Sequence, residues 1–354
     1  MRAAVYHGPE DVRIEDVPQR PLGATDVRIG VAACGICGSD LHEYRSGPML
    51  IPEERPHPIT GVTLPLVMGH EFAGEVIECG ADVSGVEPGD RVTVNPILYC
   101  GDCRYCDRGS YHLCSSGGFL GLTGRGGFAE TAVVSADSVV KLPDGVDFAG
   151  GALIEPLSVA VHAIRQSGLQ LGDTVAVLGA GPIGLAVVAA ARAAGARTIV
   201  ASEPQPDRRE LAVEFGADVA VDPTTDDAVD VVRDHTDGGA DVAFEVAGIE
   251  ATFNQAIRAT AKNGTVAAVG IFEDDVTMGA RTAIPGERAV VGTLGYEGGP
   301  LAALDFKRTL ALLERGAFDP SAFVTARIGL DEIVEAGFEA LLDGGEHVKV
   351  LVEP

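Results

Sequence analysis

The sequence predicts an α/β protein with two domains, a β-rich domain and a doubly wound parallel sheet. Its 354 residues suffice for a hydrophobic core in each domain. Short alternating strands with glycine and proline turns occupy the first part, whereas strands alternate with helical stretches in the second. We therefore expect the β-rich domain over residues 1–156, completed by residues 295–354, and the parallel sheet over residues 157–294.

Charge and hydropathy restrict the partners and the location of the protein. Hydrophobic residues make up 46% of the chain, which excludes a disordered protein, but the net charge is −26 with only four lysines. Such a surface argues against nucleic acid and anionic membranes as partners. It is typical of proteins from a high-salt cytoplasm, where ions screen the repulsion between like charges. No secretion signal opens the sequence, and the longest apolar stretch, Ile183 to Ala191, is too short to span a bilayer. We expect a halophilic, cytoplasmic protein.

The strands expected in the first domain alternate apolar and polar residues and are separated by glycine- or proline-rich turns. Their ranges are 1–6, 11–15, 26–32, 75–79 and 90–94. A proline-rich loop over residues 48–65 interrupts this pattern, and we expect it to line a site.

The nine-residue segment that follows the third strand, residues 34–42, contains two thiols, a hydroxyl and an imidazole. They belong to Cys34, Cys37, Ser39 and His42. From the residues alone, three interpretations of the Cys34-x-x-Cys37 pair stay open: a zinc ligand, a buried structural thiol and a redox pair. Ser39-Asp40 has the composition of a helix N-cap, which would place Cys37 on the preceding loop.

Further candidate ligands follow in separate segments, namely His70, Glu71 and Glu155. Cysteine, histidine and carboxylate side chains from separate segments are what a catalytic zinc site requires, with one position left open for substrate. The sequence therefore offers the parts of such a site without showing that they meet.

Four cysteines within fifteen residues have the spacing C-x2-C-x2-C-x7-C; they are Cys100, Cys103, Cys106 and Cys114. Four thiolates can surround one zinc ion tetrahedrally and leave no open position, as in a structural site. An iron–sulfur cluster is the alternative that also accepts four cysteines. The single compact lobe favours structural zinc.

A glycine-rich loop between a strand and a helix opens the second domain. The strand covers 174–178, the helix covers 185–194 and the next strand covers 198–202. In this setting the G-x-G-x-x-G pattern predicts a dinucleotide-binding Rossmann loop, whose backbone approaches the pyrophosphate at the helix N-terminus. Its expected cofactor-binding residues are Gly179, Gly181, Pro182, Ile183 and Gly184.

Glu203 stands nineteen residues after Gly184, where a carboxylate would bind the adenosine ribose and repel the 2′-phosphate of NADP. Arg208 is included among the cofactor-binding residues because an arginine nearby could accommodate that phosphate. We favour NAD over NADP.

Four further strands would complete a six-stranded sheet, at residues 219–221, 242–246, 265–269 and 289–293. A helix is expected over residues 301–315. A last strand over residues 348–352 is expected to return to the first domain.

The whole chain resembles the zinc-dependent medium-chain alcohol dehydrogenase family. The segment Gly69-His70-Glu71-x2-Gly74-x5-Gly80-x2-Val83 matches the zinc signature of that family at every fixed position. The segments Gly38-Ser39-Asp40 and Glu155-Pro156-Leu157-Ser158 look like its polyol and butanediol dehydrogenase branch. Three loops, which contain Gly47-Pro48, Pro56-His57-Pro58 and residues 118–128, resemble those of (R,R)-2,3-butanediol dehydrogenases.

The resemblance implies a GroES-like catalytic domain, two zinc ions per chain, NAD and a homodimer or homotetramer. The catalytic zinc would be held by Cys37, His70 and an acid, for which Glu71 and Glu155 compete and Glu155 is favoured. Ser39 would take the proton of the alcohol, and His42 would pass it to solvent.

The expected reaction is reversible oxidation of a secondary alcohol or vicinal diol, foremost (R,R)-2,3-butanediol to acetoin. A polyol dehydrogenase that acts on sorbitol or xylitol would share every motif named. A nucleotide-binding relative without activity is the alternative from another class.

Overall fold

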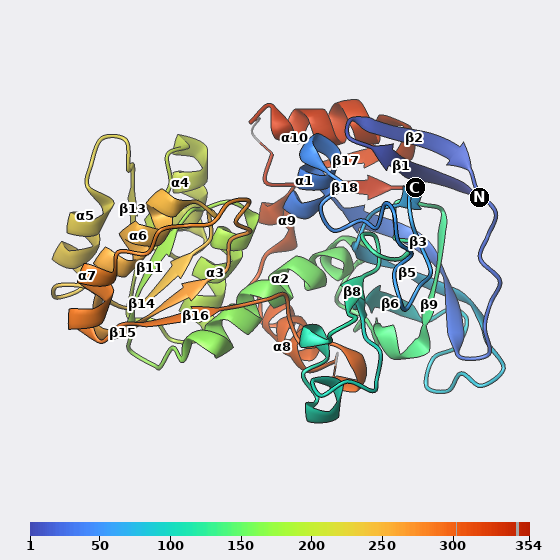
Figure 1. Cartoon of the computed structure of the whole chain (residues 1–354), viewed down its shortest axis with the longest axis horizontal. Coiled ribbons are helices and arrows are strands. Elements are labelled where there is room, and N and C mark those ends of the chain that lie inside the picture. The colour runs from blue at the N-terminus through green and yellow to red at the C-terminus, as the bar shows by residue number, and fades with distance from the viewer. Residues whose placement is uncertain (302, 345–346) are drawn as a thin grey trace. The chain divides into compact units, whose positions relative to one another are not determined.

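The computed structural model describes residues 1–301, 303–344 and 347–354, and the chain divides into two compact units (Figure 1). The first unit comprises Met1–Glu155, Tyr296–Glu314 and Asp319–Pro354. The second comprises Pro156–Gly295 and Arg315–Phe318. Helix α2 (Phe148–Ser167) runs across the boundary between them in the sequence.

The first unit is built on a seven-stranded sheet whose centre is β3 (Asp26–Gly35). This strand pairs antiparallel with β5 (Glu71–Cys79), β9 (Thr131–Ser135) and β18 (Lys349–Glu353). The end of the chain therefore lies in the same sheet as the strand that leads to Cys34 and Cys37. The other strands of this unit are β1 (Arg2–Gly8), β2 (Asp11–Asp16), β4 (Leu66–Val67), β6 (Arg91–Val94), β7 (Ile97–Leu98), β8 (Gly118–Phe119), β10 (Val139–Lys141) and β17 (Val324–Gly329).

Strand β5 begins at Glu71, four residues earlier than predicted. Gly74 explains the difference, because a side chain there would place its Cβ 2.0 Å from the carbonyl oxygen of Gly30 on β3. The glycine interrupts the alternating pattern in the sequence, yet it is what lets the two strands approach. As a result Glu71 is part of the sheet and pairs with Gly35.

The helices that lie wholly in the first unit are short, and the longest of them is α8. They are α1 (Gly38–Ser46), α8 (Ala303–Glu314), α9 (Pro320–Phe323) and α10 (Ala340–Leu342), with a π-helical segment at Ile333–Glu339. Helix α1 comes next after β3 in the chain. Helix α8 matches the helix predicted over residues 301–315 within two residues.

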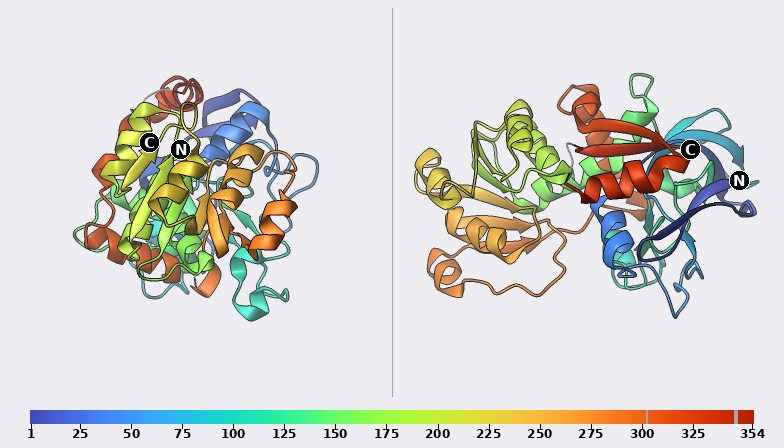
Figure 2. Two further views of the ribbon diagram at one scale, coloured as in Figure 1. Left: turned by 90° about the vertical axis from the view of Figure 1, so that its left-hand side faces the viewer. Right: turned by 90° about the horizontal axis from the view of Figure 1, so that it is seen from above.

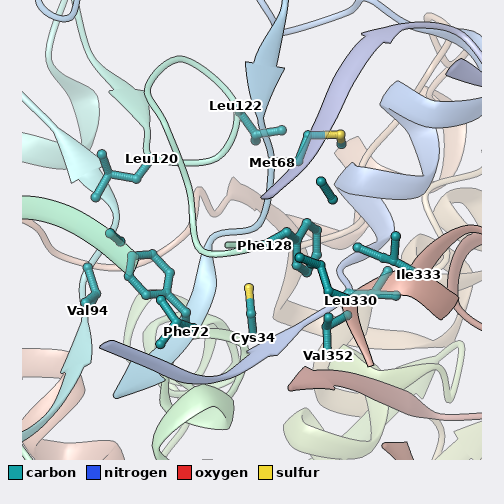
Figure 3. Close-up of a cluster of buried hydrophobic side chains, with 14 of the residues drawn as sticks. Cys34, Met68, Phe72, Val94, Leu120, Leu122, Phe128, Leu330, Ile333 and Val352 are labelled. Atoms are coloured by element: carbon teal, nitrogen blue, oxygen red, sulfur yellow. The ribbon is translucent and has the colours of Figure 1, made fainter. Parts of the chain in front are cut away.

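The core of the first unit combines aliphatic and aromatic side chains and encloses one of the candidate thiols (Figure 3). Phe128 packs edge-to-face on Phe338 with ring centroids 6.1 Å apart. Cys34 lies beside Phe72 and Phe128 with none of its surface exposed. Burial raises the pKa of the Cys34 thiol well above its ordinary value, so this residue is a structural thiol and not a reactive one.

The second unit is a six-stranded parallel sheet with the strand order β13-β12-β11-β14-β15-β16, the order of a Rossmann fold. Its helices pack around the sheet (Figure 2). The fold class predicted from the sequence is confirmed. The strands are β11 (Thr174–Leu178), β12 (Thr198–Ser202), β13 (Val219–Val221), β14 (Ala240–Glu245), β15 (Thr260–Ala268) and β16 (Ala289–Gly292). The helices are α3 (Pro182–Ala193), α4 (Pro206–Glu214), α5 (Ala228–His235), α6 (Glu250–Ala259) and α7 (Ala280–Ala283).

Among the helices of the described residues, none combines the length and the apolar character that crossing a membrane would need.

Candidate active site and metal centres

Helix α1 places Cys37 at its N-terminus. The prediction that Ser39-Asp40 forms the N-cap was wrong, because the helix begins at Gly38 and Cys37 itself is the N-cap residue. Asp40 acts from the third helical position, where its Oδ2 accepts a hydrogen bond of 2.9 Å from the Cys37 N–H. The thiol of Cys37 therefore sits at the N-terminal end of the helix, where the helix dipole is positive.

Sheet pairing brings His70 and Glu71 to this thiol. Gly35 of β3 pairs with Glu71 of β5, so the residues just beyond β3 lie next to the residues that open β5. Ligand atoms of Cys37, His70 and Glu71 lie within 4.8 Å of one another. A thiolate, an imidazole and a carboxylate at this separation fit the donor set of a zinc ion.

His70 is held from both sides of its ring. Its Nε2 is 3.3 Å from the hydroxyl of Ser39, and its Nδ1 is 3.6 Å from Oδ1 of Asp40, a carboxylate without exposed surface. Burial by itself would lower the pKa of His70, but Asp40 and Cys37 raise it well above its ordinary value. A carboxylate behind the imidazole is the arrangement that orients histidine ligands in metal sites. His42 is half-buried one turn after Ser39 on α1.

The two candidate acids have different partners. Both oxygens of Glu71 accept hydrogen bonds from Nζ of Lys349, at 2.6 and 2.8 Å, and Lys349 also donates to the carbonyl of Ile36. Glu155 instead accepts a hydrogen bond of 2.5 Å from the hydroxyl of Tyr296. Burial raises the pKa of Glu155 to about 7, although the nearby His70 lowers it. The structure thus brings Glu71 into the cluster with Cys37 and His70. Glu155 lies outside that cluster but close enough to interact with the charges of His70 and Glu71.

The four-cysteine lobe forms a second donor cluster. Its sulfur atoms lie 3.4, 3.6, 4.0 and 4.0 Å apart in the pairs that touch, and all four thiols are free. Four sulfurs about 2.3 Å from a zinc ion in tetrahedral geometry would be about 3.8 Å apart. The lobe therefore fits a single ion, and a multi-iron cluster, whose ligands bind different irons, would need wider spacing. The residues are Cys100, Cys103, Cys106 and Cys114.

Backbone N–H groups also prepare this lobe for metal. Hydrogen bonds from the backbone of Cys106 and Ser115 lower the pKa of Cys103 to about 6. A thiol with that pKa is largely ionised at neutral pH, and the thiolate is the form that binds zinc. The pKa of Cys100 is raised to about 11 by its hydrogen bond with Asp102, and burial raises the pKa of Cys106. Cys103 is therefore the thiol that this backbone favours as a thiolate.

The glycine-rich loop of the second unit joins β11 to α3. Gly179 has φ +105°, a left-handed conformation that favours glycine, and Gly181 is the N-cap residue of α3. A Cβ at Gly184 would come within 2.0 Å of the carbonyl oxygen of Gly179. The helix begins at Pro182, three residues before its predicted start, so Pro182 and Ile183 form its first turn.

Glu203 follows β12 and turns back onto this loop. Its Oε2 accepts a hydrogen bond of 2.8 Å from the Ala180 N–H, and its Oε1 accepts one from Gln205. Arg208 is half-buried on α4. The neighbouring Arg209 donates to the carbonyls of Glu203 and Pro204.

Comparison with known proteins agrees with this geometry. Residues 23–144 match the family model of the alcohol dehydrogenase GroES-like domain, and residues 182–315 match that of zinc-binding dehydrogenases. The chain is 44% identical to (R,R)-butanediol dehydrogenase of Bacillus subtilis over the full length of both proteins. The crystal structure of 2R,3R-butanediol dehydrogenase from Bacillus subtilis superposes with a TM-score of 0.93 at 43% identity, covering 100% of this chain and 99% of that one.

The chain belongs to the zinc-dependent medium-chain alcohol dehydrogenases. Sorbitol dehydrogenase of Bacillus subtilis is a more distant relative in this family, 34% identical over 100% of this chain and 97% of its own. The resemblance inferred from the sequence motifs is confirmed.

Three residues of this medium-chain dehydrogenase site were missed by sequence reasoning: Asp40, Tyr296 and Lys349. Asp40 had a local signal, because an acid three residues after an N-cap completes a capping box. Lys349 and Tyr296 had none, since each meets its partner across a long stretch of chain. Lys349 is one of only four lysines in the protein and is 3% exposed.

Proposed function

We propose that this chain is a zinc- and NAD-dependent dehydrogenase that interconverts (R,R)-2,3-butanediol and acetoin. The observation that carries the proposal is that Cys37, His70 and Glu71 meet beside the hydroxyl of Ser39, with Glu155 as a second buried carboxylate close to His70. Full-length similarity at 44% identity to a butanediol dehydrogenase supports the choice of substrate.

Cys37 and His70 would hold the catalytic zinc together with Glu155 as third protein ligand. The pairing of Glu71 with Lys349 supports this choice, because both oxygens of Glu71 already have a cationic partner. When bound, zinc supplies Lewis-acid stabilisation of the alcohol oxygen as the alcohol loses its proton. The four-cysteine lobe would hold the structural zinc.

The residues of the chain itself move the proton. The hydroxyl of Ser39 lies 3.3 Å from Nε2 of His70, so an alcohol hydroxyl bound at this cluster would be within its reach. Ser39 accepts the proton of the alcohol, and His42, one helical turn further on, carries it to solvent.

The second unit would bind NAD. Gly179, Gly181 and Gly184 let the backbone approach the pyrophosphate, with Pro182 and Ile183 in the first turn of α3. Glu203 would bind the adenosine ribose, and Arg208 is the residue that could serve NADP. A zinc-binding dehydrogenase from Sinorhizobium meliloti was crystallised with NADP. It is 32% identical to this chain, with a TM-score of 0.87 over 100% of this chain and 99% of its own. Activity with NAD and with NADP is therefore to be measured side by side.

Residues 1–156 and 295–354 would thus form the catalytic domain, and residues 157–294 the NAD-binding domain. We further assign the enzyme to a reducing, high-salt cytoplasm. The free thiols of the four-cysteine lobe and the net charge of −26 support this assignment.

We also propose that the enzyme is a homodimer or homotetramer that associates through β16. This strand ends the six-stranded order, and apolar side chains on and near it are exposed: Ile284 by 73%, Val290 by 40% and Leu294 by 52%. Edge strands with apolar surface are sites of strand pairing between chains.

Replacing Val290 with lysine is expected to shift the protein toward monomer in light scattering coupled to size exclusion. The matched control is Val213→Lys on α4, where the valine is 51% exposed. Equal masses for Val290→Lys and wild type would reject β16 as the interface.

The deciding experiment follows NADH absorbance in molar salt with (R,R)-butanediol, meso-butanediol, sorbitol and ethanol, and with NADP as cofactor control. We expect kcat/KM for (R,R)-butanediol to exceed that for sorbitol by about 100-fold or more, since a longer, more polar substrate misfits a pocket built for a short diol. Faster oxidation of sorbitol would favour the polyol dehydrogenase alternative, which the similarity to sorbitol dehydrogenase keeps open. Zinc-replete protein that oxidises none of them would favour the inactive relative.

A further inference from the structure

The loop between Cys37 and His70 is anchored on the helix that carries the proton-transfer residues. Glu43 lies in the last turn of α1 and is 1% exposed. Its Oε1 accepts hydrogen bonds from the N–H groups of Leu50 (2.5 Å) and Ile51 (3.3 Å). Its Oε2 accepts one from Met49 (2.9 Å). One buried carboxylate therefore ties down three consecutive residues of the loop.

Neighbouring residues close this anchor sterically. The hydroxyl of Tyr6 donates a hydrogen bond of 2.7 Å to the carbonyl of Glu43. A Cβ at Gly47 would lie 2.6 Å from Oε2 of Glu43 and 2.8 Å from the Tyr6 hydroxyl. A side chain at position 47 would have to displace Glu43 or the Tyr6 hydroxyl, so the packing at the start of the loop requires glycine.

The far part of the loop has a second anchor. His57 is 8% exposed, and its Nε2 lies 3.3 Å from the carbonyl of Gly117. The hydroxyl of Thr60 donates a hydrogen bond of 2.5 Å to the carbonyl of Thr123. The loops that resemble butanediol dehydrogenases in sequence are thus joined to one another in the structure.

The first anchor lies beside the candidate chemistry. Ser39, His42 and Glu43 are spaced i, i+3 and i+4 on α1, so their side chains share one helix face. The loop is bound to that face through the Glu43 carboxylate, which accepts the N–H groups of residues 49–51. It presents Met49 and Leu50, which are 47% and 58% exposed although both are large and apolar.

We propose that Glu43 is a specificity-determining positioning residue, which fixes residues 49–51 against the helix that carries Ser39 and thereby restricts the site to short alcohols. This inference rests on the proposed dehydrogenase function. Glu43 contacts neither substrate nor metal in this role; it acts through the loop. Hydrogen bonds to a carboxylate are about twice as strong as neutral ones, so its removal releases the loop in a way that loss of a surface acid does not.

The test compares Glu43→Ala and Glu43→Gln with the matched control Glu54→Ala, which removes an exposed acid from the same loop. In Glu43→Ala the KM for (R,R)-butanediol is expected to rise about tenfold with kcat nearly unchanged, because substrate positioning is lost while the chemistry is intact. The preference for butanediol over sorbitol should fall by a similar factor. Glu43→Gln keeps the acceptor for Leu50 and Ile51 but not the one for Met49, so an intermediate value is expected.

Hydrogen exchange of the Met49, Leu50 and Ile51 amides gives a readout without substrate. Faster exchange in Glu43→Ala together with the changed preference supports the proposal. Unchanged amide exchange in Glu43→Ala would show that Glu43 does not hold the loop. Faster exchange with an unchanged preference for butanediol over sorbitol would reduce Glu43 to a structural role. Either result overturns the proposal. A wild-type protein that oxidises no alcohol would contradict the proposed function instead, while the exchange comparison still reports on the anchor.

Discussion

Replacing His70 with alanine is expected to remove one of two zinc ions per chain and to lower kcat by about 10⁴-fold or more. Zinc can lower the pKa of a bound water from about 15.7 to about 7, and each unit is worth about 1.4 kcal/mol. No side chain near Ser39 could replace that stabilisation at neutral pH. His70 is 4% exposed and lies between Ser39 and Asp40, so alanine removes the imidazole donor from this buried cluster.

Zinc content per chain and turnover are measured on the same preparation. His7→Ala is the matched control, since His7 pairs with Glu15 on the β1–β2 hairpin and should leave both zinc ions and the activity in place. Cys103→Ala is expected to remove the other zinc. Two zinc ions per chain in His70→Ala, or activity near that of wild type, would show that the cluster around Cys37 is not the catalytic metal site.

Replacing Lys349 with methionine is expected to lower the free energy of unfolding by about 3–5 kcal/mol, because the change leaves the Glu71 carboxylate buried without its cation. The two side chains are 3% and 0% exposed, so water cannot take the place of the ammonium group. Burial lowers the pKa of Lys349 by itself, but Glu71 raises it above its ordinary value, so the lysine stays charged.

Urea unfolding in molar salt measures this effect. Arg327→Met is the matched control in the neighbouring strand β17. Its partner Glu353 lies 2.8 Å away, but the pair is 51% and 46% exposed and should contribute about 1 kcal/mol or less. The double variant Lys349→Met with Glu71→Gln should recover part of the loss, since the uncompensated charge is gone. A double variant as unstable as Lys349→Met alone would show that packing, not charge, is what the lysine provides.

Features that are local in the chain could be predicted from the sequence. The four cysteines span fifteen residues, and the backbone that joins them suffices to gather their thiols. The glycine-rich loop is likewise one turn between a strand and a helix, so its residues are neighbours in any folded state. The alternation of strands and helices predicted a six-stranded doubly wound sheet for the second unit for the same reason, because each crossover is short, and the structure supplied the strand order.

The tertiary structure alone decided which charges are buried and what compensates them. Lys349 meets Glu71 across 278 residues, and Tyr296 meets Glu155 across 141. Lys349 reaches Glu71 because β3 pairs with both β5 and β18. The sequence pattern shows a lysine opening an apolar strand and a glutamate beside a histidine, each of which would be solvated on its own. Burying a charge is costly unless its partner is buried with it, and the pairing of distant strands is what supplies that partner.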